Sequence, residues 1–288
     1  MLILAPLVYF IVFKYQPMYG LIIAFKNFRP SKGIWGSPWA GFKNFTNFIG
    51  TYRFWPVFIN TFLVSTYTVF AMFPFAIVLS LALHSTKFPR FRRITQTVVY
   101  APHFISTVVV VSMVIQVLHT KLGVANMAIQ ALGLSPVSFL SNPSYFRPIY
   151  VVSEIWQHAG WNTVLYLASL AGVDVTLHEA ASIDGASRLR RLWHIDVMTI
   201  LPTIVIMLIL NTAEVLGVGF EKVFLMQNDL NLSASEVIPT YVYKMGVATS
   251  LPNYSYATAI GLFGSVISLT LIIAVNKIAK KASDISLW

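Results

Sequence analysis

Six apolar stretches, each long enough to cross a lipid bilayer, constrain this chain more than any other feature. A helix that spans the hydrocarbon core needs about 20 mainly apolar residues. Inside lipid the backbone amide and carbonyl groups must bond within their own segment, so these stretches are predicted to be helices, and the alternation typical of membrane strands is absent. The predicted fold class is an all-α, polytopic membrane helix bundle with six transmembrane helices. The stretches cover residues 1–25, 55–83, 97–119, 149–172, 201–220 and 254–275.

Composition excludes the soluble classes of protein. Only 10% of the 288 residues are charged and 57% are hydrophobic, whereas a soluble domain carries about 25% charged residues. A disordered chain is also excluded, because disordered chains have low hydrophobicity and a high content of charged residues. The net charge of +10 is explained by basic residues at the ends of membrane spans. The expected partner is therefore the lipid bilayer and not a nucleic acid. The chain has no cysteine, which excludes disulfides, thiol catalysis and cysteine metal sites.

The connecting segments give a weak indication of orientation. Segments 84–96 and 173–200 and the C-terminal tail hold ten lysine and arginine residues. Segments 26–54, 121–148 and 221–253 hold eight, with Lys222 left out because, like Lys14, it lies at a helix boundary. The positive-inside rule therefore only slightly favours the first set, with both termini, in the cytoplasm. The first span also begins without a basic flank, so we expect further residues upstream of it.

Segment 26–55, predicted to be an extracytoplasmic loop, is rich in aromatic residues and glycine. Two interpretations stay open: an aromatic belt at the membrane–water interface, which we favour, and a platform on which sugar rings stack. The aromatic residues are Phe28, Trp35, Trp39, Phe42, Phe45, Phe48, Tyr52, Phe54 and Trp55.

Segment 173–200, between the fourth and fifth predicted spans, carries the most informative pattern. It is predicted to form a short amphipathic helix, a turn at Gly185 and a second helix. Ala180 and Ala181 give the first helix a small, smooth surface and high helix propensity, and glycine permits the positive φ of a sharp turn. A short helix that projects from a bundle and fits a groove is typical of a mechanical coupler. The second helix has an apolar stripe made of Leu189, Leu192, Trp193 and Ile195.

This segment resembles the EAA loop of the permeases of binding-protein-dependent ABC importers. In that pattern Glu-Ala-Ala is followed by three residues, Gly, nine residues, Ile, one residue and Leu-Pro. Val197 and Met198 stand where the pattern has Leu-Pro, which leaves the geometry leading into the fifth span open. The matching positions, which the resemblance assigns to ATPase coupling, are Glu179, Ala180, Ala181, Asp184, Gly185, Ala186 and Ile195.

The resemblance extends along nearly the whole chain. The sequence is similar to the LplB-like oligosaccharide and polysaccharide permeases, a group that includes permeases of alginate and rhamnogalacturonan-fragment importers. This implies a type I ABC importer permease (MetI-like) fold with a cytoplasmic coupling helix, residues 1–288 as one transmembrane permease domain, and location in the bacterial cytoplasmic membrane. The similar segments are 13–20, 24–28, 41–45, 60–61, 101–106 and 254–261.

The same resemblance implies the partners. A second permease subunit forms the pathway with this chain, two ATPase subunits bind on the inside, and an extracytoplasmic solute-binding protein delivers the oligosaccharide. ATP and Mg are expected in the ATPase subunits, and no cofactor is expected in this chain. The chain lacks the Gly-x-x-x-x-Gly-Lys-Ser/Thr phosphate loop, so we do not expect it to be an enzyme.

Polar residues inside predicted spans are costly and are therefore candidates for function. On the fourth span five of them recur at spacings that place them on one helical face. On the fifth span Asn211 and Glu214 lie three residues apart. Both groups are candidates for the substrate pathway, with hydrogen bonding between helices as the alternative. The five residues of the fourth span are Glu154, Gln157, His158, Trp161 and Asn162.

Two other sets of polar residues are given no functional role. The second span carries one asparagine and three hydroxyl side chains, and the hydroxyls are expected to bond back to their own helix. The histidines lack the spacing of metal ligands, so we expect no metal site. The first set is Asn60, Thr61, Ser65 and Thr68, and the histidines are His103, His119, His158 and His194.

Two other classes of membrane protein fit the composition. A secondary sugar transporter driven by an ion gradient is expected to show repeated halves and broken helices with charge pairs, which the sequence lacks. A membrane-embedded enzyme is expected to show a nucleophile–base pair or paired carboxylates at one depth, and neither is visible. The favoured function is the permease subunit of an ATP-dependent oligosaccharide importer.

Overall fold

The computed structural model describes residues 3–213, 217, 219–283 and 285–287. In this part of the chain four helices are long and apolar enough to cross a bilayer. Two further pairs of helices are long enough if each pair, bent at a short break, counts as one span. The structure thus contains between four and six candidate spans and agrees with the predicted all-α membrane bundle. The four are Leu4–Phe25, Phe54–His84, Arg188–Thr212 and Tyr254–Ser283.

Short turns of other helix types interrupt two of these spans. The first span joins α1 (Leu4–Phe10) and α2 (Gln16–Met18) through a π-helical turn, and it ends in a 3-10 turn at Tyr19–Phe25. The span beginning at Arg188 joins α11 (Arg188–Arg191) and α12 (Met198–Ala213) through the π-helical turn Leu192–Val197. The other long helices are α5 (Phe54–His84), α9 (Pro143–Leu170) and α16 (Tyr254–Ser283).

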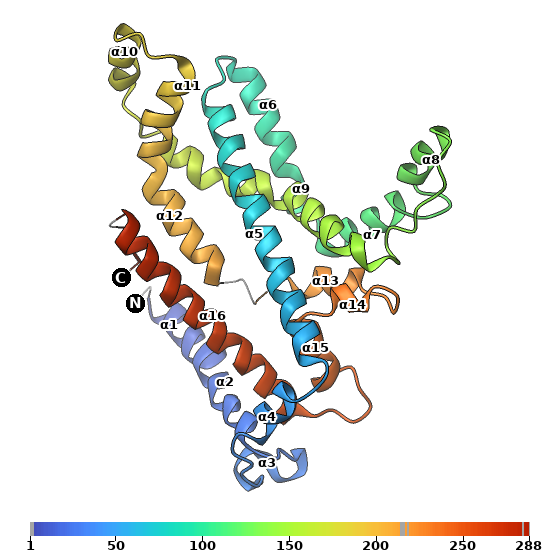
Figure 1. Cartoon of the computed structure of the whole chain (residues 1–288). Coiled ribbons are helices and arrows are strands. Elements are labelled where there is room, and N and C mark those ends of the chain that lie inside the picture. Colours follow the sequence, from blue (N-terminus) through green and yellow to red (C-terminus); the bar gives the residue numbers. More distant parts are fainter. Residues whose placement is uncertain (1–2, 214–216, 218, 284, 288) are drawn as a thin grey trace.

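Shorter helices connect the spans. They are α3 (Gly33–Gly36), α4 (Lys43–Ile49), α6 (Pro89–Tyr100), α7 (Thr107–Val117), α8 (Val124–Ala131), α10 (Val175–Ile183), α13 (Phe220–Met226), α14 (Leu232–Ser235) and α15 (Ile238–Gly246). Figure 1 shows α10 and α11 at one end of the molecule, and α3 and α4 at the opposite end.

The third predicted span, 97–119, is wrong as a single helix. The chain bends by 100° between the helical stretch Pro89–Phe104 and α7. Pro102 has no backbone N–H to donate to a continuing helix, and Ser106 starts α7 as its N-cap, with its Oγ accepting from the Val109 N–H. Hydropathy averaged along the sequence cannot register this bend, because the residues on both sides of it are apolar.

The fifth predicted span, 201–220, begins too late. The helix already starts at Arg188 and continues through the π-helical turn to Ala213. The arginines of α11 lower the local hydropathy without ending the helix. Residues 214–216 and 218, in the second half of the predicted span, lie outside the described residues.

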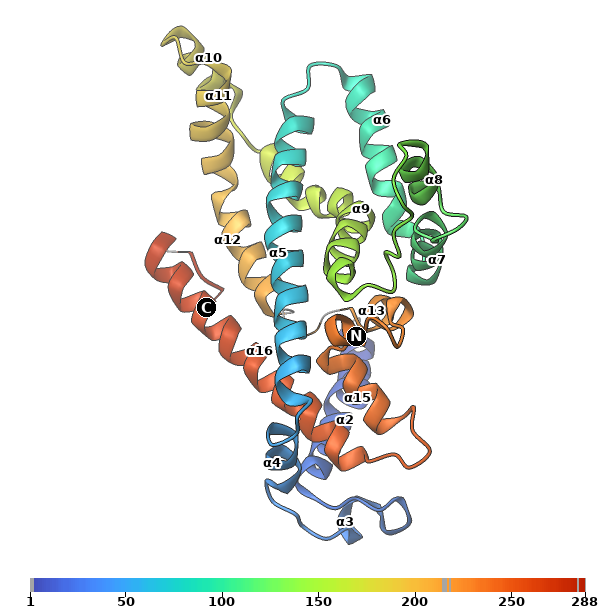
Figure 2. The ribbon, with the colours of Figure 1, turned by 45° about the vertical axis from the view of Figure 1, so that its right-hand side comes forward.

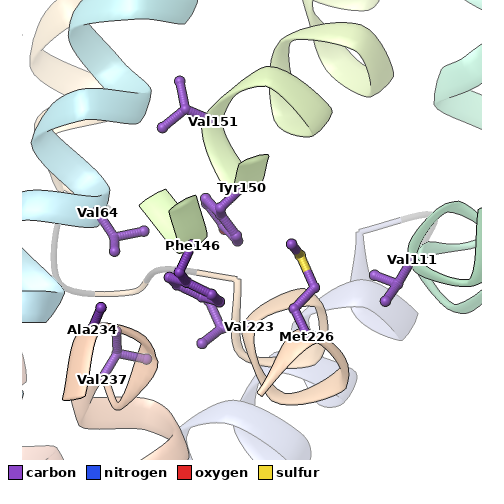
Figure 3. Close-up of a cluster of buried hydrophobic side chains, with 9 residues drawn as sticks. All are labelled: Val64, Val111, Phe146, Tyr150, Val151, Val223, Met226, Ala234 and Val237. Atoms are coloured by element: carbon purple, nitrogen blue, oxygen red, sulfur yellow. The ribbon is translucent and has the colours of Figure 1, made fainter. Parts of the chain in front are cut away.

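The segment between the fifth and sixth spans folds back against the bundle, although the sequence predicts only a connection there. Figure 2 shows α15 beside α5, and α13 packs against α7 and α15. In Figure 3, Phe146 and Tyr150 of α9 lie between Val64 of α5 and the side chains Val223 and Met226 of α13. Because lipid offers little hydrophobic driving force between helices, this close packing is what holds the short helices in place.

The aromatic residues of segment 26–55 differ in burial, with Phe28 and Phe45 half-buried between two extremes. Phe48 and Phe54 are buried in a cluster with Tyr241 of α15 and Ile260 of α16. A second group is largely exposed, which suits the predicted aromatic belt and leaves the sugar-stacking alternative open. The exposed group is Trp35, Trp39, Phe42, Tyr52 and Trp55.

Candidate functional site

A polar cavity of about 330 Å³ lies between α5, α9 and α12. The α9 side chains Glu154, His158 and Asn162 line it at intervals of four residues, which places them along one stripe of the helix. Asn211 of α12 also lines the cavity. The structure therefore brings together four of the candidate pathway residues. The full lining is Ser65, Thr68, Val69, Met72, Tyr150, Glu154, His158, Asn162, Asn211, Gly217 and Gly219.

Glu154 is paired with a buried lysine that the sequence analysis left without a role. Lys222 Nζ lies 2.8 Å from Glu154 Oε1, and its side chain is only 3% exposed. The same ammonium donates to Gln157 Oε1 (3.1 Å) and lies 5.8 Å from the centroid of the Tyr150 ring. Gln157 therefore lies beside the cavity rather than in its wall. The Lys222 ammonium of α13 therefore balances the charge of the Glu154 carboxylate, which faces the cavity.

Two histidines connect the bend of the third span to α9. Nδ1 of His103, in the 3-10 turn Ala101–Phe104, lies 3.0 Å from Nδ1 of His158. The His103 ring also stacks on Trp161, with centroids 4.6 Å apart and planes 1° from parallel. Trp161 therefore stacks on this histidine and does not line the cavity. His158 Nε2 in turn lies 3.8 Å from Glu154 Oε2.

Two contacts hold this bend against α9: a hydrogen bond from a glutamine amide and a close approach at a glycine. Gln157 Nε2 donates to the Ile105 carbonyl oxygen (3.1 Å). Gly160 lets α9 approach α6 closely, because a Cβ at this position would overlap the Val99 carbonyl oxygen of α6. The sequence gives no signal for this pairing, since α6 and α9 are far apart along the chain.

One hydroxyl group on the cavity wall has no hydrogen-bond partner within the described residues. Ser65 of α5 is buried and lines the cavity, and its Oγ is unpaired. The expectation that hydroxyls of the second span bond back to their own helix is wrong for Ser65. It is confirmed for Thr61 and Thr68, which donate to carbonyl groups one turn back in α5. An unpaired buried hydroxyl is uncommon, so Ser65 is suited to bond a polar molecule in the cavity.

The two amide side chains in the cavity wall, Asn162 and Asn211, use only part of their hydrogen-bonding capacity. Asn162 donates to Met72 Sδ (2.9 Å), a weak acceptor. Asn211 donates to the Met207 carbonyl oxygen of its own helix (2.7 Å). Glu214, the last pathway candidate, lies outside the described residues.

The predicted coupling segment has the expected local structure. Asp174 caps the N-terminus of α10 by accepting from the Thr176 N–H, and this bond lowers the pKa of the Asp174 carboxyl. Gly185 ends the helix with φ of 74°. The Ala186 N–H donates to the Ala181 carbonyl and the Gly185 N–H to the Ser182 carbonyl. These two bonds form a Schellman motif, in which glycine is favoured.

Segment 173–200 exposes large apolar side chains at the end of the molecule. Glu179, Ala180, Asp184 and Gly185 are exposed, and Ala181, Ala186 and Ile195 are half-buried. The side chain of Ile183 is 87% exposed. Exposed apolar residues grouped on a projecting segment, here α10, α11 and the turn that follows, are typical of a protein interface. The large ones are Val175, Leu177, Ile183, Leu189 and Trp193.

Within the described residues no group of three or more histidine, aspartate and glutamate side chains is placed to hold a metal ion.

No protein-family model matches the chain. Protein LplB of Bacillus subtilis (strain 168) is 42% identical over 98% of this chain and 88% of its own length. The polygalacturonan/rhamnogalacturonan transport system permease protein YteP of the same organism is 39% identical, over 99% of this chain and 88% of that protein. The crystal structure of a bacterial alginate ABC transporter, in complex with a periplasmic protein that holds an alginate pentasaccharide, contains a chain of the same fold. That chain is 32% identical with a TM-score of 0.91, over 99% of this chain and 95% of the other.

Proposed function

This chain belongs to the LplB-like permeases of ABC sugar transporters, and from that premise we propose that it imports an oligosaccharide or a polysaccharide fragment across the bacterial cytoplasmic membrane. Two relatives support this class of substrate: one is described by polygalacturonan and rhamnogalacturonan, the other by alginate. The ion-gradient alternative has no support from the relatives.

The cavity between α5, α9 and α12 is the observation that carries this proposal. Its walls offer a carboxylate, an imidazole, two amides and the unpaired Ser65 hydroxyl, which are the groups that hydrogen-bond sugar hydroxyls. Its volume of about 330 Å³ lies at the lower end of the range for small-molecule sites, about 300–1,000 Å³. We assign the substrate pathway to this cavity, with Glu154, His158, Asn162 and Asn211 in its wall.

The end of the molecule that carries α10 and α11 indicates where an ATPase partner would bind. We propose that α10 and α11 face the cytoplasm and dock into an ATPase subunit through Glu179 to Ala186 and the exposed apolar side chains around them. ATP and Mg then belong to two ATPase subunits and this chain has no enzymatic activity of its own. A second permease and a solute-binding protein complete the assembly. The alginate transporter bound to its periplasmic protein supports the binding protein.

The cavity assignment is tested with Ser65→Ala in the complete transporter reconstituted in liposomes. Loss of one neutral hydrogen bond costs about 0.5–1.5 kcal/mol, so uptake at limiting loaded binding protein should fall about 2- to 12-fold. Ser80→Ala is the matched control, because Ser80 is a buried serine of the same helix that bonds the Ile77 carbonyl away from the cavity. Equal uptake by both variants would remove Ser65 from the pathway.

A further inference from the structure

A carboxylate is buried where the fifth span leaves the coupling segment. Asp196 lies in the π-helical turn Leu192–Val197 and its side chain is 5% exposed. Its Oδ1 lies 3.0 Å from Nε2 of His178 on α10 and 3.9 Å from Nε2 of His84 at the end of α5. One carboxylate therefore contacts imidazoles from two other elements. Neither His178 nor Asp196 has a role in the coupling pattern described above.

Two arginines of α11 add bonds to the same region. Arg191 Nη1 donates to the His178 carbonyl oxygen (3.3 Å), and Arg188 Nη2 donates to the Ser85 carbonyl oxygen just beyond α5 (2.6 Å). Each bond joins the segment that begins the fifth span to α10 or to the end of α5.

Within the described residues, side-chain hydrogen bonds attach α10 to the fifth span at His178, through its ring to Asp196 and through its carbonyl to Arg191. None of its residues is buried, so apolar packing contributes little to its position. Of its side chains, His178 makes the contact with the buried Asp196. An imidazole bonded to a buried carboxylate is a stronger and more directional contact than a bond between neutral groups.

The helices that receive this attachment are also walls of the cavity. Ser65 and Thr68 belong to α5, and Asn211 belongs to α12, the continuation of the span that contains Asp196. A displacement of α10 would therefore be passed to two of the three helices around the cavity. Without the bond between His178 and Asp196, α10 could move while those helices stayed in place.

We infer that Asp196 is a positioning residue: its contact with His178 makes α10 move as one body with the fifth span and the end of α5, so that motion of a docked ATPase reaches the cavity. The inference rests on the proposed docking of the ATPase at α10. It predicts that breaking the contact uncouples ATP hydrolysis from transport without releasing the ATPase.

The test compares His178→Ala and His178→Gln with His194→Ala in the complete transporter. Glutamine keeps an N–H donor for Asp196. His194 is an exposed histidine of the same segment whose Nδ1 lies against the Arg190 carbonyl of its own helix (3.0 Å), so it is the matched control. The measurements are ATPase co-purification, hydrolysis stimulated by loaded binding protein, and sugar imported per ATP hydrolysed.

We expect His178→Ala to keep the ATPases and their hydrolysis but to import at least about tenfold less sugar per ATP, since a bond to a charged group is lost. His178→Gln should recover most of the ratio and His194→Ala should not change it. An unchanged ratio in His178→Ala overturns the inference. Loss of the ATPases from His178→Ala overturns it as well, because the role would then be docking.

A reversed pair settles the case in which the His178→Ala permease itself fails to fold and is not recovered from the membrane. His178→Asp combined with Asp196→His restores the contact with the partners exchanged. Assembly with recovered import per ATP supports the inference, and failure to assemble or to import overturns it. The docking proposal fails separately: Ala180→Arg, which leaves the contact intact, would then retain the ATPases and normal transport.

Discussion

The ion pair between Lys222 and Glu154 gives the sharpest prediction about stability. Its charged atoms are 2.8 Å apart, with side chains 3% and 14% exposed. At an effective dielectric constant of 20 their attraction is about 6 kcal/mol, which offsets a desolvation cost of several kcal/mol for each ion. The pair is therefore nearly neutral as a whole. Removing Lys222 alone leaves a buried carboxylate uncompensated and costs about 3–5 kcal/mol.

We expect Lys222→Met to destabilise the protein strongly, and Lys222→Met combined with Glu154→Gln to recover about 2 kcal/mol or more of that loss. The assay is the fraction of purified complex that stays monodisperse after heating, measured for both single variants and the double variant. Lys121→Met, which removes an exposed lysine between α7 and α8, is the control. Additive losses in the double variant, or a loss from Lys222→Met no larger than the control's, would refute the pairing argument.

The pairing also changes what a substitution of Glu154 can report. Glu154→Ala leaves Lys222 buried without its carboxylate, so assembly is expected to fall together with transport. Glu154→Ala is therefore a poor probe of the pathway, and Ser65 is the better one.

Three further predictions concern topology, docking and helix packing. An impermeant thiol reagent should label Ser31→Cys but not Ser187→Cys in intact cells, because we place the first outside and the second in the cytoplasm; the reverse pattern would invert the topology. Gly185→Val should weaken co-purification of the ATPases without loss of membrane expression, since a β-branched residue at positive φ costs roughly 1 kcal/mol or more and adds bulk to an exposed turn; full retention by this variant and by Ala180→Arg would remove the docking role. Gly160→Ala should lower the temperature at which the complex loses monodispersity, because its Cβ would overlap a backbone carbonyl of α6; unchanged stability would mean that α6 can shift away.

Local features of the coupling segment were predictable because their causes are local. The turn at Gly185 follows from glycine after a short helix. Asp196 and His178 were not singled out, because only the fold brings the start of the fifth span beside α10.

The same distinction holds inside the membrane. The i, i+4 spacing of Glu154, His158 and Asn162 predicted one stripe on α9, and the structure places that stripe on a cavity. The partner of Glu154 was missed because Lys222 lies in a short helix that folds back into the bundle. His103 was set aside for lack of metal-ligand spacing, yet the bend of the third span brings it to His158.

The energy source of transport tests the central claim most directly. The complete transporter, with both permeases, the ATPases and the binding protein, is reconstituted in liposomes and given an oligosaccharide derived from an acidic polysaccharide. The account predicts that loaded binding protein stimulates ATP hydrolysis, and that uptake needs ATP and is unaffected when ion gradients are collapsed. Uptake by this chain without the ATPases, driven by an ion gradient, would contradict the account.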